Sequence, residues 1–151
     1  MDSVSEARLQ LVNKWAIKYS LDAALVCAIC EQESSWNQWA VRYEPAFFSH
    51  YIQPMLNNNT LHTMTEATLR ATSFSYMQTM GQVAREMGFN GQYLTQLFDP
   101  EVGLDMGCKV LRHKLDAASS VEGGLLLYNG GADKSYPAEV LARVGKYQED
   151  Q

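Results

Sequence analysis

The stretch over residues 24–37 constrains the fold most strongly, because it joins an apolar helix directly to a group of polar side chains. Asp22 is a typical N-cap residue, and the positions that follow, up to Cys30, are apolar on nearly every helical face. A helix that is hydrophobic on all sides belongs in a protein interior. The sequence therefore predicts a buried helix whose C-terminal end carries Glu31 and Glu33.

Helical spacing distinguishes these two acids. Glu33 lies on the same face as Ile29 and Cys30, whereas Glu31 lies about 160° away around the helix axis. A carboxyl among apolar neighbours has a raised pKa, which suits a general acid near neutral pH. A helix that simply emerges into water would explain both acids without any catalytic role. Glu33 is therefore a candidate acid on spacing, and its assignment depends on the rest of the chain.

The composition of the chain indicates one globular domain spanning residues 1–151, with 46% hydrophobic and 19% charged residues. The net charge of −5 and the lack of a dense basic run argue against nucleic acid and against an anionic membrane surface as partners. No apolar stretch is long enough to cross a bilayer, and no signal-peptide core is visible near Met1. We expect a monomer that is made in the cytoplasm and does not insert into membranes.

Cysteine and histidine patterns give no support for a metal or redox centre. Cys27 and Cys30 formally match C-x-x-C, but both lie inside the apolar helix and are better interpreted as small buried hydrophobes. His50, His62 and His113 are scattered without the spacing of metal ligands. We expect neither a metal nor a cofactor.

Most of the remaining chain shows helical periodicity. One predicted helix starts at Thr72 or Ser73 and ends before Gly88. Between residues 38 and 72 the periodicity fails, aromatic residues are dense, and prolines interrupt any long element. We predict short helices or a small hairpin there, forming a second lobe beside a groove. A first helix is predicted to begin at the capping box of residues 3–6 and to continue to Tyr19, and further helices are predicted over residues 100–117, 121–127 and 136–147.

Four segments resemble motifs of the soluble lytic transglycosylase family, and they occur in the same order as in that family. They are residues 33–37 (E-S-S-W-N, for E-S-x-W-N), 76–78 (Y-M-Q, for G-L-M-Q), 128–131 (Y-N-G-G, for A-Y-N-A-G) and 136–141 (for Y-x-x-x-V-L). Each motif is weak alone, but together they span nearly the whole chain. The resemblance implies a mostly α, lysozyme-like single domain of about seven helices, with an irregular second lobe bordering the substrate groove.

The resemblance also implies an activity. Such enzymes cleave the β-1,4 bond between N-acetylmuramic acid (MurNAc) and N-acetylglucosamine (GlcNAc) in peptidoglycan glycan strands. They do so without water, leaving a 1,6-anhydroMurNAc end, and use one glutamate as acid and then as base without a cofactor. Carried onto this sequence, Glu33 is the catalytic residue, and Tyr136 could donate a hydrogen bond to it. The residues implied to bind substrate are Ser34, Met77, Gln78, Tyr128, Asn129 and Tyr136.

Two features depart from the common family pattern. The segment between Glu33 and Gln78 is longer than in many members and resembles that of phage-encoded relatives. Ser75 and Tyr76 stand where the family has Gly and Leu, which puts the shape of the groove in question. We expect a phage-type, antibacterial endolysin or related enzyme that degrades the cell wall and reaches it through a holin, a virion or a secretion apparatus.

Two other functions compete with this hypothesis. A hydrolytic muramidase, similar to goose-type lysozyme, would need a second carboxylate such as Glu44 or Glu66 to activate water. Arg42 or Arg70 could instead pair with Glu44 and hold it in a structural role. A catalytically silent glycan-binding or virion structural module is the alternative of another class.

Overall fold

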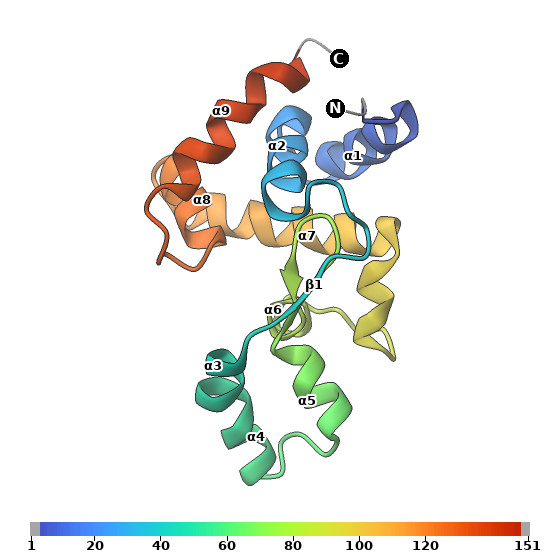
Figure 1. Ribbon diagram of the computed structural model, residues 1–151, viewed down its shortest axis with the longest axis vertical. Helices are drawn as coiled ribbons and strands as arrows, with labels where there is room; N and C mark the ends of the chain where they lie inside the picture. The colour runs from blue at the N-terminus through green and yellow to red at the C-terminus, as the bar shows by residue number, and fades with distance from the viewer. Residues whose placement is uncertain (1–3, 149–151) are drawn as a thin grey trace.

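The computed structural model describes residues 4–148 and shows a mostly helical single domain with a small antiparallel sheet (Figure 1). The fold class predicted from the sequence is confirmed. The outermost residues of the predicted 1–151 domain, 1–3 and 149–151, lie outside the described part of the chain. Within that part, no helix has the length and apolar character needed to cross a membrane.

Helix α2 (Ala23–Ser34) occupies the centre of the main core, as the sequence predicted. Asp22 caps it by accepting a hydrogen bond from the Ala24 N–H at 2.9 Å, and every residue from Ala24 to Cys30 is buried. Four helices supply most of the side chains that surround it, and Trp36, Tyr76 and Met77 complete the cluster. The four helices are α1 (Glu6–Lys18), α7 (Pro100–Asp116), α8 (Val121–Tyr128) and α9 (Tyr136–Gln148).

Polar contacts fix α9 against the C-terminal half of α2. The Trp36 indole N–H donates to the Tyr147 hydroxyl at 2.9 Å in a buried contact. Glu31 forms an ion pair with Lys146 and lies 3.5 Å from the Arg143 guanidinium. Glu31 therefore has a structural role, because its ion pairs join α2 to α9.

The helix predicted to start at Thr72 or Ser73 is wrong in its first half. Residues 72–80 form strands β2 (Thr72–Phe74) and β3 (Thr79–Met80), and only α6 (Gly81–Glu86) is helical. Strand β1 (Val41–Tyr43) pairs antiparallel with β2, and β2 pairs antiparallel with β3. The turn between β2 and β3 places Ser75 and Gln78 at φ of 66° and 49°, angles that a right-handed helix excludes. Pairing between the strands therefore outweighs the helical spacing of apolar residues that predicted a helix here.

Residues 38–72 form the predicted second lobe, which lies at the opposite end of the molecule from the two termini (Figure 1). After β1, the chain forms a continuous helical run and then α5 (Met64–Arg70). That run consists of α3 (Pro45–Phe47), the π-helix η1 (Phe48–Ile52) and α4 (Gln53–Asn57). The lobe has its own small core, centred on Ile52, Leu61, Ala67 and Ala71.

The start of α7 follows its sequence signals closely. Asp99 caps the helix by accepting from the Glu101 N–H at 2.8 Å, and Pro100 occupies the first helical position. Just before it, η2 (Leu94–Phe98) forms a short 3₁₀ helix. Leu94 and Leu97 of η2 pack with Phe74 and Met106 in a third cluster, which joins the sheet to α7.

Ser75 carries a conformational strain that leads to a stability prediction. Its side chain is 1% exposed, its φ of 66° lies in the left-handed region, and its hydroxyl has no hydrogen-bond partner among residues 4–148. Ser75→Gly removes the Cβ that disfavours this angle and the unpaired hydroxyl together. We expect the free energy of unfolding, measured in urea, to rise by about 1 kcal/mol.

Ser75→Ala is the matched control, because it removes the hydroxyl but keeps the Cβ at the same backbone angle. We expect its stability to lie between those of wild type and Ser75→Gly. Equal stability of the glycine and alanine variants would show that the backbone angle contributes no strain.

Candidate active site

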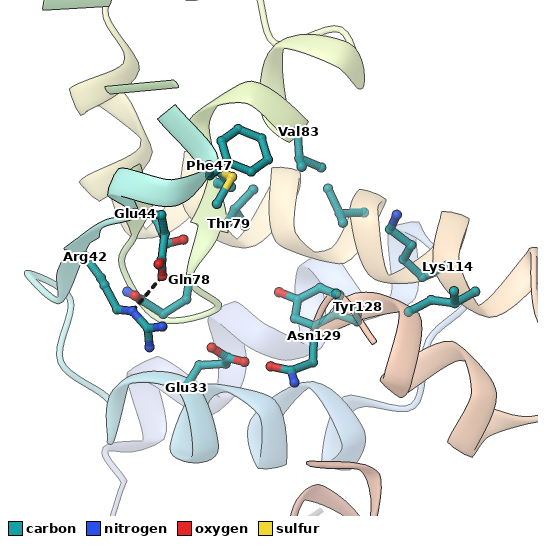
Figure 2. Close-up of a pocket in the computed structure, with 15 residues that line it drawn as sticks. Glu33, Arg42, Glu44, Phe47, Gln78, Thr79, Val83, Lys114, Tyr128 and Asn129 are labelled. Atoms are coloured by element: carbon teal, nitrogen blue, oxygen red, sulfur yellow. Dashed lines mark ion pairs between the residues drawn. The ribbon is translucent and has the colours of Figure 1, made fainter. Parts of the chain in front are cut away.

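A cleft of about 330 Å³ lies where the C-terminal end of α2 faces the sheet and the second lobe (Figure 2). Its floor includes Glu33, and one wall is formed by Arg42, Glu44 and Phe47 from the second lobe and the strand leading to it. Gln78 and its neighbours in the β2–β3 turn continue that wall, and residues of α7 and α8 form the other. The cleft thus brings together segments from across the chain around one carboxyl group.

Glu33 lies in the last turn of α2, and its carboxyl points into the cleft (Figure 2). Burial raises the pKa of Glu33 above its ordinary value, and the Tyr136 hydroxyl and the Arg42 guanidinium offset that rise only in part. Glu31, two residues earlier, does not line the cleft and is paired with Lys146. Of the two acids, only Glu33 combines a place in the cleft with a raised pKa, which are the features expected of a general acid.

Tyr136 lies behind Glu33 rather than in the cleft lining. It is 3% exposed, and within residues 4–148 its hydroxyl makes no hydrogen bond of ordinary geometry. The hydroxyl is nonetheless near enough to the Glu33 carboxyl to lower the pKa of that acid. Burial, with the nearby Glu33 charge, raises the pKa of Tyr136 well above its usual range, so the phenol stays protonated. Tyr136 therefore lies beside Glu33 but outside the cleft lining, and its contact with substrate stays a prediction.

Three of the predicted substrate-binding residues line the cleft. The Gln78 side-chain NH₂ donates to the backbone carbonyls of Ala40 and Ser75, at 3.0 and 2.9 Å, which leaves its Oε1 without a partner among the described residues. The Tyr128 hydroxyl donates to the Met77 carbonyl at 2.6 Å, so its ring is held as part of the wall. Asn129 follows α8, and its amide projects into the cleft on the side of Glu33 (Figure 2).

Met77 and Ser34 are not placed as predicted. Met77 is 1% exposed and packs against α7 so closely that a Cβ on Gly107 would lie 2.5 Å from the Met77 sulfur. The Ser34 hydroxyl lies 2.9 Å from both the Cys30 and the Tyr76 carbonyl oxygens, where it joins α2 to the β2–β3 turn. Neither residue lines the cleft, and their contact with substrate stays a prediction.

The two candidate second carboxylates differ in position. Glu44 lines the cleft and forms a 2.6 Å ion pair with Arg42, as one of the two predicted pairings required. Glu66 lies outside the cleft, in α5, with Arg70 at 3.0 Å and Arg85 at 2.7 Å. Burial raises the pKa of Glu66, but hydrogen bonds from the two arginines outweigh it and hold the pKa below its ordinary value. Glu66 therefore does not share the cleft with Glu33 and is bound to two arginines.

The structure adds Phe47 and Lys114 to the cleft, which sequence reasoning did not find. Phe47 belongs to the irregular segment, where no periodicity indicated the direction of any side chain. Lys114 lies in the last turn of α7, where a basic residue is usual for electrostatic reasons alone. Only the packing of α7 against α8 turns that position toward the cleft.

The comparisons with known proteins agree with the motifs. The family model described as Transglycosylase SLT domain matches residues 10–147, which includes all four motif segments. Neither the comparison with curated proteins nor that with solved structures gives a match. The observed fold is consistent with the lysozyme-like fold of that family, and the family indicated by the sequence is confirmed.

The raised pKa of Glu33 predicts a pH-dependent effect of Glu33→Gln on stability. A carboxyl whose pKa is higher in the folded than in the unfolded protein stabilises the fold. The stabilisation is complete at pH values below the pKa of the unfolded state, which is near 4.5. That contribution is lost as the pH rises through the folded-state pKa. Since glutamine does not titrate, urea unfolding should show Glu33→Gln gaining stability relative to wild type between pH 4 and pH 8.

Glu31→Gln serves as the control on the same helix. It removes the ion pairs with Lys146 and Arg143, and we expect it to lower stability at neutral pH. A stability difference between Glu33→Gln and wild type that is the same at every pH would contradict a raised pKa for Glu33.

Proposed function

The chain belongs to the Transglycosylase SLT domain family of peptidoglycan lytic transglycosylases, and we propose on this basis that it cleaves the MurNAc–GlcNAc bond with Glu33 as acid and then as base. The observation that carries the proposal is the position of Glu33 on the floor of the cleft, with its pKa raised by burial. A protonated carboxyl at that point can reach a glycan strand lying in the cleft. No second unpaired carboxylate lines the cleft among residues 4–148.

The reaction proceeds in two proton transfers at Glu33. In the first, the protonated carboxyl gives its proton to the glycosidic oxygen, the C1–O bond breaks, and the GlcNAc hydroxyl departs. In the second, the C6 hydroxyl of the same MurNAc attacks C1, and the Glu33 carboxylate takes its proton. The new C1–O6 bond closes the 1,6-anhydro ring and restores the protonated acid, so water is neither consumed nor released.

The groups around Glu33 support each half of this cycle. Burial favours the protonated state needed for the first transfer, and the positive charge of Arg42 favours the carboxylate needed for the second. The free Oε1 of Gln78 and the amide of Asn129 are placed to bind polar groups of the sugars, such as the N-acetyl group. Phe47 and the Tyr128 ring offer apolar surface to the sugar faces.

Hydrolysis with Glu44 as base is the second candidate, because Glu44 shares the cleft with Glu33. An inverting hydrolase needs its second carboxylate free to activate a water. The Glu44 carboxylate is instead held by Arg42 at 2.6 Å, which supports a structural role for it and favours transglycosylation. The long segment between Glu33 and Gln78, which forms the second lobe, supports the further proposal of a phage-type enzyme delivered to the wall by a holin, a virion or a secretion apparatus.

Glu33→Gln is expected to remove activity while leaving the fold intact, because the amide keeps the shape of the side chain but carries no transferable proton. Release of soluble fragments from isolated peptidoglycan should fall by at least about 10²–10⁴-fold. Glu31→Gln, compared at a temperature where it remains folded, should keep most of the activity. The reverse result, with Glu31→Gln inactive and Glu33→Gln active, would show that Glu31 is the catalytic acid. Binding of glycan without turnover in the wild type would instead indicate a silent module.

The products distinguish a transglycosylase from a hydrolase. Mass spectrometry of digested peptidoglycan should show 1,6-anhydroMurNAc ends, each lighter by one water than the reducing ends that hydrolysis gives. The same products should appear with Glu44→Gln, because Glu44 takes no part in either proton transfer. Reducing ends as the main product, lost in a folded Glu44→Gln protein, would establish the hydrolase instead.

A further inference from the structure

Lys114 differs from the other lysines and arginines in its lack of a partner. Within residues 4–148, each of the others has a hydrogen bond, an ion pair or a ring contact, whereas the Lys114 ammonium has none. Lys14 and Lys18, for example, pair with Glu101 and Asp105, and Lys109 donates to the Met87 carbonyl. Lys114 is half-buried, and its ammonium is therefore available to a ligand or to solvent.

Lys114 lines the same cleft as Glu33. Figure 2 shows Lys114 on one side of Glu33 and Arg42 on the other. The same lining includes the uncharged residues Val110, Leu127 and Gly130. Neither acid of the cleft forms an ion pair with Lys114, since Glu44 pairs with Arg42 and Glu33 interacts with Tyr136. The side of the cleft near Lys114 therefore presents a cation with no protein anion to neutralise it.

Two effects favour a lysine at position 114, and neither of them involves an anion of the protein. The C-terminal end of α7 favours a basic residue, and the aliphatic stem of a lysine can cover the apolar side chains of Val110 and Leu127. Neither effect provides an anion. The charge is thus available to a ligand that enters the cleft.

We propose that Lys114 binds a carboxylate carried by the muramoyl residue of the substrate. This inference rests on the proposed function and specifies how the cleft would select its substrate. In an alternating GlcNAc–MurNAc strand only the muramoyl residue bears a carboxylate, either the free acid of its lactyl group or an acid of the attached stem peptide. A cation at a fixed distance from Glu33 sets the register of the strand and discriminates against neutral β-1,4 glycans.

Binding measurements on Glu33→Gln protein test this inference separately from turnover. The ligands are three oligosaccharides of equal length: alternating GlcNAc–MurNAc with stem peptides, the same glycan without peptides, and neutral GlcNAc oligomers. Lys114→Met removes the charge and keeps an apolar stem, and Lys114→Arg restores the charge. Lys134→Met is the control, because Lys134 lies outside the cleft lining and donates only to the Gly131 carbonyl.

We expect Lys114→Met to raise the Kd for muramoyl ligands by about 2- to 5-fold, the size of one partly exposed ion pair, and to leave neutral oligomers unaffected. The loss should shrink between about 0.05 M and about 0.5 M salt, because the interaction is electrostatic. Lys114→Arg should bind like the parent protein, and Lys134→Met should show no change. In otherwise wild-type protein, Lys114→Met should raise KM on peptidoglycan with little change in kcat.

The three ligands also distinguish the two sources of the carboxylate. A loss confined to peptide-bearing glycan assigns the contact to the stem peptide, and a loss with the peptide-free glycan assigns it to the lactyl group. An unchanged Kd for every ligand, or an equal loss for neutral oligomers, would overturn the inference while leaving Glu33-dependent cleavage intact. Selective muramoyl binding by a wild-type protein that cleaves nothing would overturn the proposed function and leave this inference standing.

Discussion

The rest of the structure depends on the burial of α2. A helix that is apolar on every face cannot remain in water, so α1, α7, α8 and α9 must surround it. Only its last turn is polar, and that turn lies where the helical core meets the sheet and the second lobe. The requirement to bury α2 therefore also determines where the Glu33 carboxyl is placed. The hydrophobic core and the site have one common origin.

The same helix places two acids in opposite electrostatic environments. Glu31 faces α9, where Lys146 and Arg143 balance its charge. Glu33 faces the cleft, where burial outweighs the influence of Arg42 and raises its pKa. Two intervening peptide units rotate the side chain far enough around the axis to place one acid in an ion pair with α9 and the other in the cleft. Helix geometry, rather than any difference in residue type, divides these roles.

The second lobe acts on the site through the sheet. The Ser75 N–H donates to the Ala40 carbonyl at 2.8 Å, and the Gln78 amide donates to the same carbonyl. These bonds join the start of β1, the strand that carries Arg42, to the turn that carries Gln78, so the two parts of this cleft wall are directly connected. The left-handed backbone angles at Ser75 and Gln78 are part of that turn. Local strain is thus located in the segment that shapes the cleft.

The sequence alone determined the local features, which depend only on residues close together in the chain. The cap at Asp22, the apolar faces of α2 and the position of Glu33 at its end all follow from helical spacing and the motifs. The tertiary structure decided what periodicity cannot express, because a pattern shows which face of an element is apolar but not which partner covers it. Pairing with β1 made residues 72–74 a strand, and packing against Gly107 buried Met77. The ion pair between Glu66 and Arg85 likewise depends on a residue that is distant in sequence. The position of Lys114 in the cleft lining depends on how α7 packs against its neighbouring helices.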